Sequence, residues 1–155
     1  MEIPNIDESD RRILAALQDD GRISNAALAK LVGLSPAACF ERVRRLRQQG
    51  LIRGFTALLD PQKLDRGLLV FVEIVLDRTT PDVFDQFARA VREMPEVLEC
   101  HMVAGGFDYL IKVRVRDMEA YRQFLGASLT SLPGVRETHT YAVMEEVKHS
   151  MRLPL

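Results

Sequence analysis

A repeat spaced by 38 residues is the feature that most constrains how this chain can fold. The positions that recur are Val83, Phe87, Val91, Met94, Pro95, Val97, Glu99 and His101, matched by Tyr121, Leu125, Leu129, Leu132, Pro133, Val135, Glu137 and His139. In both copies, apolar residues at helical spacing precede a proline and then a β-rich segment. The repeat therefore predicts that the second part of the chain contains two copies of a unit in which a helix is followed by a strand.

Two further β-rich segments complete this pattern. Strands are predicted over 69–76, 97–104, 107–115 and 135–144, and helices over 81–94 and 118–132. This βαββαβ order predicts a ferredoxin-like α+β sandwich, with both helices on one face of a four-stranded antiparallel sheet. We expect the other face to pack against a second copy, because the strands are too apolar for a solvated surface. The residues behind this expectation are Val70, Phe71, Val72, Ile74, Val75, Leu110 and Ile111.

Three short helices are predicted before this part of the chain. Asp7 can cap the first helix, Ser24 the second and Ser35 the third, with Pro36 in the third helix's first turn. A glycine turn at 32–34 joins the last two, which is typical of a helix-turn-helix. Residues 51–59 are predicted to be extended, as a wing strand and then a link. We therefore expect a winged helix-turn-helix unit over residues 1–60 and a ferredoxin-like unit over 61–155.

The third helix concentrates positive charge on a nearly neutral chain. Five arginines and one acid lie between Ala37 and Gly54, whereas the whole chain has 21 basic and 22 acidic residues. A focused basic patch is typical of a protein that binds a polyanion, although a solvated helix face can carry the same charge. The charge by itself leaves both interpretations open.

The helix-turn-helix pattern favours DNA as the polyanion. Helical spacing places Cys39, Val43 and Leu46 inward, so the opposite face is free to enter a groove. Residues near the start of the helix are candidates for base edges, and the others for phosphates. The base-edge candidates are Ala37, Ala38, Glu41, Arg42 and Arg45, and the backbone candidates are Ser24, Asn25, Ser35, Arg44, Arg47 and Arg53, with Pro36 opening the helix.

Other features exclude several classes of protein. No apolar run is long enough to span a membrane and the first residues lack a secretory leader, so we expect a cytoplasmic protein. Cys39 and Cys100 are expected to be packed thiols, and His101 and His139 to be structural repeat positions with no metal. No nucleophile elbow, phosphate loop or acid–base pair is present, so an enzyme is not expected.

A glycine pair at 105–106 is followed closely by Asp108 and Tyr109. Exposed backbone N–H groups and a nearby carboxylate are suited to the two charged ends of a free amino acid. A tight hairpin turn would also need glycine. Both interpretations are compatible with these residues.

Seven blocks resemble the Lrp/AsnC, or feast/famine, family of transcriptional regulators, and they extend over almost the whole chain. These blocks are 19–25, 32–36, 41–46, 69–74, 107–109, 132–135 and 143–148. The resemblance implies a RAM-type C-terminal domain and a regulator that dimerises, assembles into octamers or related rings, binds promoter DNA at the nucleoid and responds to a small amino acid such as leucine, without a cofactor. It also implies an effector site between C-terminal modules.

The resemblance assigns the effector role to a defined set of positions. These are Gly105, Gly106, Asp108, Tyr109, Ser128, Thr130, Leu132, Thr138, Thr140 and Val143. Gly106 stands where the family has an acidic residue and Thr130 where it has a leucine, so the effector is not fixed by the resemblance. The alternative function is an amino-acid-binding module that associates with an enzyme and not with DNA.

Overall fold

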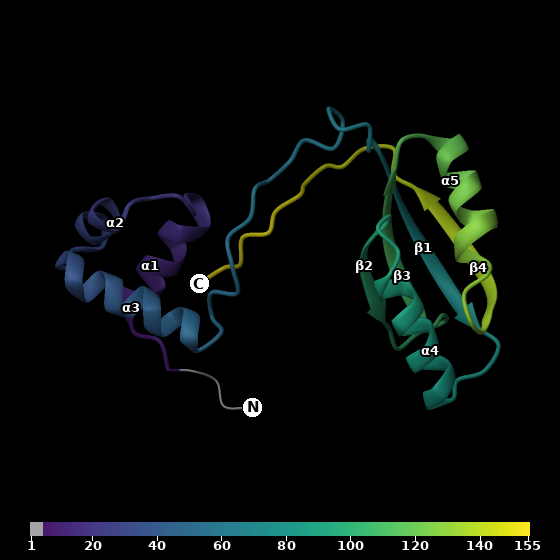
Figure 1. The fold of residues 1–155 in the computed structure, drawn as a ribbon, viewed down its shortest axis with the longest axis horizontal. Coiled ribbons are helices and arrows are strands. Elements are labelled where there is room, and N and C mark those ends of the chain that lie inside the picture. Colours follow the sequence, from purple (N-terminus) through teal and green to yellow (C-terminus); the bar gives the residue numbers. More distant parts are fainter. Residues whose placement is uncertain (1–4) are drawn as a thin grey trace. The chain divides into compact units, whose positions relative to one another are not determined.

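The computed structural model describes residues 5–155 (Figure 1). The first four residues, with which the expected N-terminal unit begins, lie outside the described residues. The chain divides into two compact units: residues up to Leu58 together with His149–Leu155, and Leu59–Lys148. Within residues 5–155, every helix is too short or too polar to cross a bilayer.

The first unit contains three helices with the predicted caps. They are α1 (Glu8–Asp19), α2 (Asn25–Val32) and α3 (Pro36–Gln48). The side chains of Asp7, Ser24 and Ser35 each accept a hydrogen bond from a backbone N–H in the first turn that follows. Gly33 ends α2 in the left-handed region, at φ 73°, which favours glycine at this turn. The helix-turn-helix is confirmed.

A small apolar core holds these helices together. Cys39 and Leu46 of α3 are fully buried, and Val43 is partly buried beside them, as the helical spacing predicts. The core is completed by Ile13, Ala16, Leu28, Ala29 and Val32. Because α3 buries a single stripe, its other faces are exposed to solvent.

The chain that follows α3 has no assigned strand before Leu68. The predicted wing strand over 51–59 is therefore not formed as a paired strand in this chain. A strand needs a neighbour for its backbone hydrogen bonds, and the described residues of the first unit contain only helices to offer one.

The last seven residues pack with the first unit, although we expected everything after residue 60 to belong to the second. The side-chain amide of Gln18 in α1 donates to the Leu153 carbonyl at 3.1 Å and accepts from the Leu153 N–H at 2.7 Å. Arg152 also forms an ion pair with Asp19. These side-chain contacts to α1 have no signal in hydrophobic spacing, which is why the sequence did not predict them.

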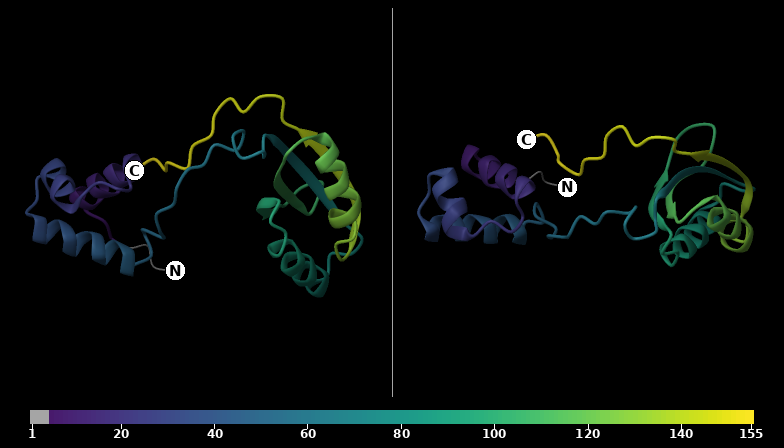
Figure 2. Two further views of the ribbon diagram at one scale, coloured as in Figure 1. Left: turned by 45° about the horizontal axis from the view of Figure 1, so that its top comes forward. Right: turned by 90° about the horizontal axis from the view of Figure 1, so that it is seen from above.

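The second unit contains the predicted βαββαβ elements. Its strands are β1 (Leu68–Leu76), β2 (Val97–Met102), β3 (Tyr109–Val115) and β4 (Val135–Ala142), and its helices are α4 (Pro81–Arg92) and α5 (Met118–Phe124). A π-helical turn, η1 (Leu125–Leu129), extends α5. The strand order is β2-β3-β1-β4 and every pairing is antiparallel. Figure 2 shows α4 and α5 on the same side of the sheet.

The core of this unit lies between the helices and one face of the sheet. Alternate residues of β1 and β3 are buried, including Val72 and Ile111 with no exposed surface. Phe87 of α4 and Tyr121 of α5 pack onto them from the helices. The fold class predicted from the repeat is confirmed.

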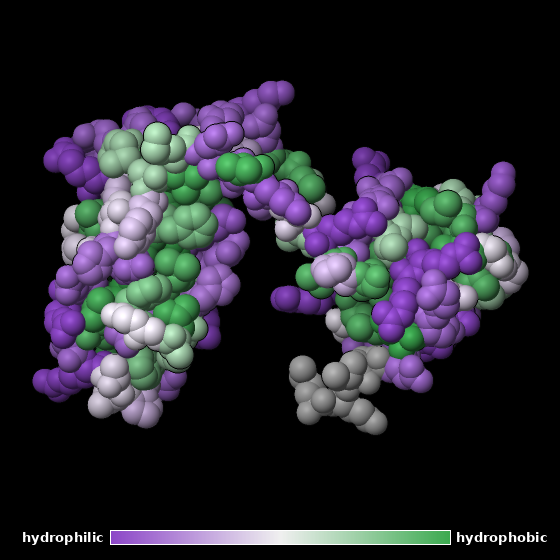
Figure 3. Space-filling model, turned by 180° about the vertical axis from the view of Figure 1, so that it is seen from behind, coloured by the Kyte–Doolittle hydropathy of each residue, from purple (hydrophilic) through white to green (hydrophobic). Residues whose placement is uncertain are grey.

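The expected composition of the open face was partly wrong. Val70, Val72, Ile74 and Ile111 lie in the core, because a strand alternates its side chains between faces. The open face carries Phe71, Val75 and Leu110 together with charged residues, which are Glu73, Glu99, Lys112 and Arg114. Figure 3, from behind, shows apolar side chains along the middle of this unit between polar edges.

Cys100 is exposed, so the prediction of two packed thiols holds for Cys39 only. Cys100 lies opposite Ile111 on the edge strand β2, where every residue after Val97 is exposed. The residues of β2 are less buried than those of β1 and β3 because an edge strand has a neighbouring strand on one side only.

Candidate DNA interface and effector site

Helix α3 presents one continuous exposed face. Ala37, Glu41, Arg44 and Gln48 follow one another on this face at helical spacing, and all four are exposed. Pro36 and Ala38 are exposed at the N-terminal end of the helix. Gln48 belongs to this face by position, although the sequence prediction of DNA contacts did not include it.

Three of the predicted backbone contacts also hold the motif together. Ser24 and Ser35 each use the side-chain oxygen as a helix cap at 3.2 Å, which leaves the hydroxyl proton free to be donated. Asn25 donates from its amide to the Pro36 carbonyl at 2.8 Å. Asn25 therefore joins the start of α2 to the start of α3.

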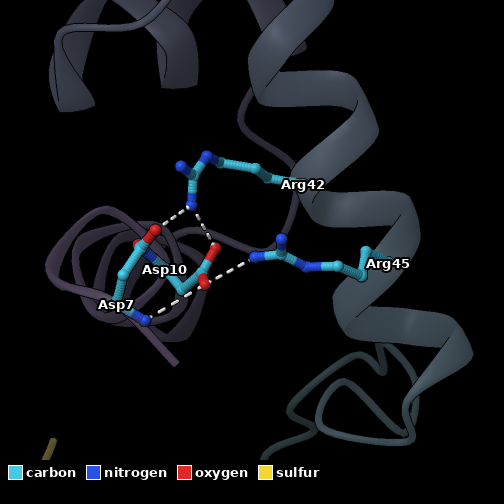
Figure 4. A network of polar contacts seen from close by, with 4 residues as sticks. All are labelled: Asp7, Asp10, Arg42 and Arg45. Carbon is cyan, nitrogen blue, oxygen red and sulfur yellow. Dashed lines mark hydrogen bonds and ion pairs between the residues drawn. The ribbon is translucent and has the colours of Figure 1, made fainter. Parts of the chain in front are cut away.

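Two arginines of α3 are bound to the first turn of α1 (Figure 4). Nη1 of Arg42 donates to Oδ2 of Asp7 at 2.6 Å and to Oδ1 of Asp10 at 2.9 Å. Nη2 of Arg45 donates to Oδ2 of Asp10 at 2.6 Å. Both carboxylates of the α1 capping box are thus shared with α3.

The electrostatics of this cluster follow from its hydrogen bonds. The Arg42 guanidinium holds the pKa of the Asp7 carboxyl below its usual range, and the same bond raises the pKa of Arg42. Asp10 is only 1% exposed and is the buried charged residue of the described chain. A buried carboxylate requires such partners, since its desolvation would otherwise be very costly.

Arg42 and Arg45 are therefore directed toward α1, whereas we expected both to reach base edges. The helical spacing of α3 did not reveal this, because the acceptors lie on another helix. A signal was present in α1: Asp10 precedes Ile13 by three residues, so it falls on the apolar stripe that faces α3. An acid at such a position requires a cationic partner.

The remaining arginines are exposed to solvent. Arg44 pairs with Glu41 at 2.6 Å, but both side chains are more than half exposed, so this pair is weak and can open for a ligand. Arg47 and Arg53 are exposed, and they line a groove of about 600 Å³ together with Arg44. Phe40 and Phe55 are among the apolar residues that line this groove.

The glycine pair of the second unit lies in an exposed turn between β2 and β3. A side chain at Gly105 or Gly106 would meet no atom within 4 Å, and neither glycine has a positive φ. The backbone of this turn therefore does not need glycine for its conformation. Asp108 fastens the turn to β1, since its Oδ2 accepts from the Leu76 N–H at 2.8 Å and its N–H donates to the Ile74 carbonyl at 2.9 Å.

Tyr109 belongs to the core and not to the exposed turn. Its ring is 4% exposed and lies 4.4 Å from Phe87 and 6.1 Å from Phe84, measured between ring centroids. Burial raises the pKa of its hydroxyl. In the same core, the Tyr121 hydroxyl bonds to Oγ1 of Thr140 at 2.6 Å.

One chain does not bring all the predicted effector residues together. Asp108 lies beside the last residues of β1, whereas the Val143 N–H bonds to Leu69 at its beginning. Seven residues of strand separate these points, or roughly 23 Å at about 3.3 Å per residue. Thr138 and Thr140 lie on β4, and Ser128, Thr130 and Leu132 lie in or just after η1.

The two repeat histidines lie on the open face of the sheet. His101 contacts Glu99 at 3.3 Å, and His139 contacts Glu137 at 3.1 Å. Within residues 5–155, no group of three or more potential ligands could hold a metal ion.

Two family models match the chain. A winged helix-turn-helix DNA-binding model covers residues 6–53, and the Lrp/AsnC ligand binding domain covers residues 69–153, which is more than half of the chain. The chain belongs to the Lrp/AsnC family. Its function is therefore that of a DNA-binding transcriptional regulator with an amino-acid-binding domain, which decides against an enzyme and against the enzyme-associated alternative.

Relatives of the Lrp/AsnC family match over nearly the full length. The leucine-responsive regulatory protein of Escherichia coli K12 is 62% identical over 96% of this chain and 91% of its own. A transcriptional regulator of Neisseria meningitidis, solved in complex with L-Met, is 37% identical with a TM-score of 0.92, and 97% of each chain is covered. The E. coli AsnC structure is 27% identical with a TM-score of 0.90, over 97% of this chain and all of that one.

Proposed function

We propose that the regulator binds promoter DNA through the exposed face of α3. Ala37, Glu41 and Gln48 lie toward the bases, and Arg44, Arg47 and Arg53 lie toward the phosphates. The observation that carries this assignment is the placement of the arginines between Ala37 and Gly54: Arg42 and Arg45 are bound to α1, whereas Arg44 and Arg47 of α3 and Arg53 after it are exposed.

The number of exposed arginines sets the expected salt dependence. Three arginines in each protomer give about six phosphate contacts in a dimer, so the slope of log K against log salt is about −5.4. Raising salt from about 50 to 200 mM then lowers the affinity roughly 2,000-fold.

Fluorescence anisotropy with labelled promoter fragments measures this slope directly. Salt-independent binding, or a slope no steeper than about −2, would contradict the role of these arginines. Adding a polyanionic competitor at each salt concentration measures specificity. Random DNA offers the protein the same phosphate contacts as the promoter does, but not the same base contacts.

For the second unit, we infer that the effector is leucine or another small apolar amino acid. The relatives named leucine-responsive are 62% identical to this chain, and the Neisseria regulator was solved with L-Met. Among the predicted effector residues, Asp108 and Val143 are hydrogen-bonded to opposite ends of β1, which favours a site completed by another copy of the chain. Calorimetry with the twenty amino acids tests this inference, and binding of acidic or basic amino acids alone would contradict it.

We also propose a homodimer joined through the open sheet face, which assembles further into an octamer or a related ring in the cytoplasm, with the nucleoid. Phe71, Val75 and Leu110 provide apolar area at the middle of that face. Light scattering with and without effector tests the assembly. A monomer at micromolar concentration would contradict it.

A further inference from the structure

The Asp10 carboxylate uses both of its oxygens on arginines of the DNA-binding helix. Oδ1 accepts from Arg42 at 2.9 Å and Oδ2 from Arg45 at 2.6 Å. The two arginine side chains are 27% and 46% exposed, whereas Asp10 is 1% exposed. The acceptor is thus fixed in the core of the unit, and the donors extend to its surface.

A carboxylate and a DNA phosphate compete for the same guanidinium. Both are anionic oxygen acceptors that match the planar fork of arginine. Asp10 is bound by both arginines, and turning both of them to phosphates would leave its buried charge unpaired, which is strongly unfavourable. These ion pairs therefore hold the Arg42 and Arg45 side chains toward α1.

We propose that Asp10 is a positioning residue that limits sequence-independent binding to DNA. It keeps two of the five basic side chains between Ala37 and Gly54 from adding phosphate contacts, so a larger share of the affinity comes from the outer face of α3. This inference rests on the proposed function, in which Arg44, Arg47 and Arg53 contact DNA. Asp10 itself touches no DNA in this proposal and acts through Arg42 and Arg45.

The test compares Asp10→Asn with Glu8→Gln in the full-length chain. Each variant removes one negative charge from the first turn of α1, but Glu8 is exposed and makes no ion pair in the described structure. The readout is the salt slope on random-sequence DNA. If one released arginine per protomer reaches a phosphate, the slope of a dimer steepens by about 1.8, which is roughly a 12-fold change over a fourfold change in salt.

We expect the steeper slope for Asp10→Asn and an unchanged slope for Glu8→Gln. We also expect the ratio of promoter to random-DNA affinity to fall in Asp10→Asn. Equal slopes in both variants and the wild type, or equal steepening in both variants, would overturn the role of Asp10. Failure of the wild type to bind DNA would overturn the proposed function instead, so the two failures are distinguishable.

A second pair of variants keeps the test decisive if Asp10→Asn does not fold. Arg42→Gln leaves Asp10 bound to Arg45, and Arg47→Gln removes an exposed arginine of the same helix. We expect Arg47→Gln to flatten the slope of a dimer by about 1.8 and Arg42→Gln to leave it unchanged. Equal flattening by both variants would show that Arg42 contacts phosphate, and would overturn the proposal.

Discussion

The Asp108 carboxylate has a structural role that can be separated experimentally from a role in binding the effector. Its Oδ2 accepts the Leu76 N–H at 2.8 Å and ties the turn before β3 to the end of β1. Replacing Asp108 with alanine leaves that half-buried N–H without its acceptor. A hydrogen bond to a charged group contributes about 1.5–3 kcal/mol, so Asp108→Ala should lower the free energy of unfolding by that amount.

Asp108→Asn should behave differently, because its amide oxygen can still accept the Leu76 N–H. Neutral hydrogen bonds are about half as strong as charge-assisted ones, so we expect a loss of about 1 kcal/mol. For a unit of this size, 1 kcal/mol corresponds to roughly 4–8 °C in Tm. Affinity for the effector should nevertheless fall 10- to 100-fold in Asp108→Asn if the carboxylate binds the ammonium group, because such a charged contact contributes about 1.5–3 kcal/mol.

Differential scanning calorimetry and titration calorimetry measure the two effects on the same samples. Protein concentration must be held constant, since association stabilises the folded chain. Glu93→Gln, an exposed acid in the same unit, is the matched control. Equal Tm losses in Asp108→Asn and Asp108→Ala would refute the structural role of the acceptor, and unchanged effector affinity in Asp108→Asn would refute the binding role.

Two further predictions concern a glycine and the response to acid. Gly134→Ala should lower the Tm of the second unit, because its φ is +74° and a Cβ would lie 2.5 Å from Cγ1 of Val83; an unchanged melting curve would contradict this. The lowered pKa of Asp7 stabilises the fold above the unfolded value of about 3.9, and this contribution is lost as pH falls through the folded pKa. Urea unfolding of the first unit at pH 3, 4 and 7 should therefore show a smaller acid loss in Asp7→Asn than in the wild type.

Local features of the sequence were sufficient to predict the helices of both units and the strands of the second, whereas the predicted wing strand over 51–59 is not formed. Ser24 and Ser35 cap their helices because a side-chain oxygen before a helix can bind only the N–H groups of its first turn, which is information carried by a few neighbouring residues. The 38-residue repeat predicted the order and sheet topology of the second unit for a similar reason: two identical supersecondary units pair in few ways.

Contacts between elements were harder to predict. Asp10 and Arg45 are 35 residues apart, and neither position shows which residue it meets across the unit. The strand faces were also misassigned, because a continuous apolar run such as Leu68–Val72 hides the two-residue alternation that separates a buried side from an open one. The predicted effector set remains a prediction for a further reason. Asp108 and Val143 are hydrogen-bonded to opposite ends of β1, and the sequence of one chain does not show which copy supplies each part of the effector site.

The two groups of arginines in and just after α3 explain how so small a unit can both fold and bind DNA. Its core contains seven buried apolar residues, which gives limited area to fix the angle between α1 and α3. Arg42 and Arg45 add hydrogen bonds to the side of α3 that faces α1, and these bonds stabilise the folded unit. Of the five arginines between Ala37 and Gly54, we therefore propose that only Arg44, Arg47 and Arg53 contact DNA. In the proposed interface, three phosphate contacts per protomer bind DNA weakly by themselves, and tight binding requires several units held together. We therefore expect the affinity for long promoter fragments to follow the assembly state of the second unit.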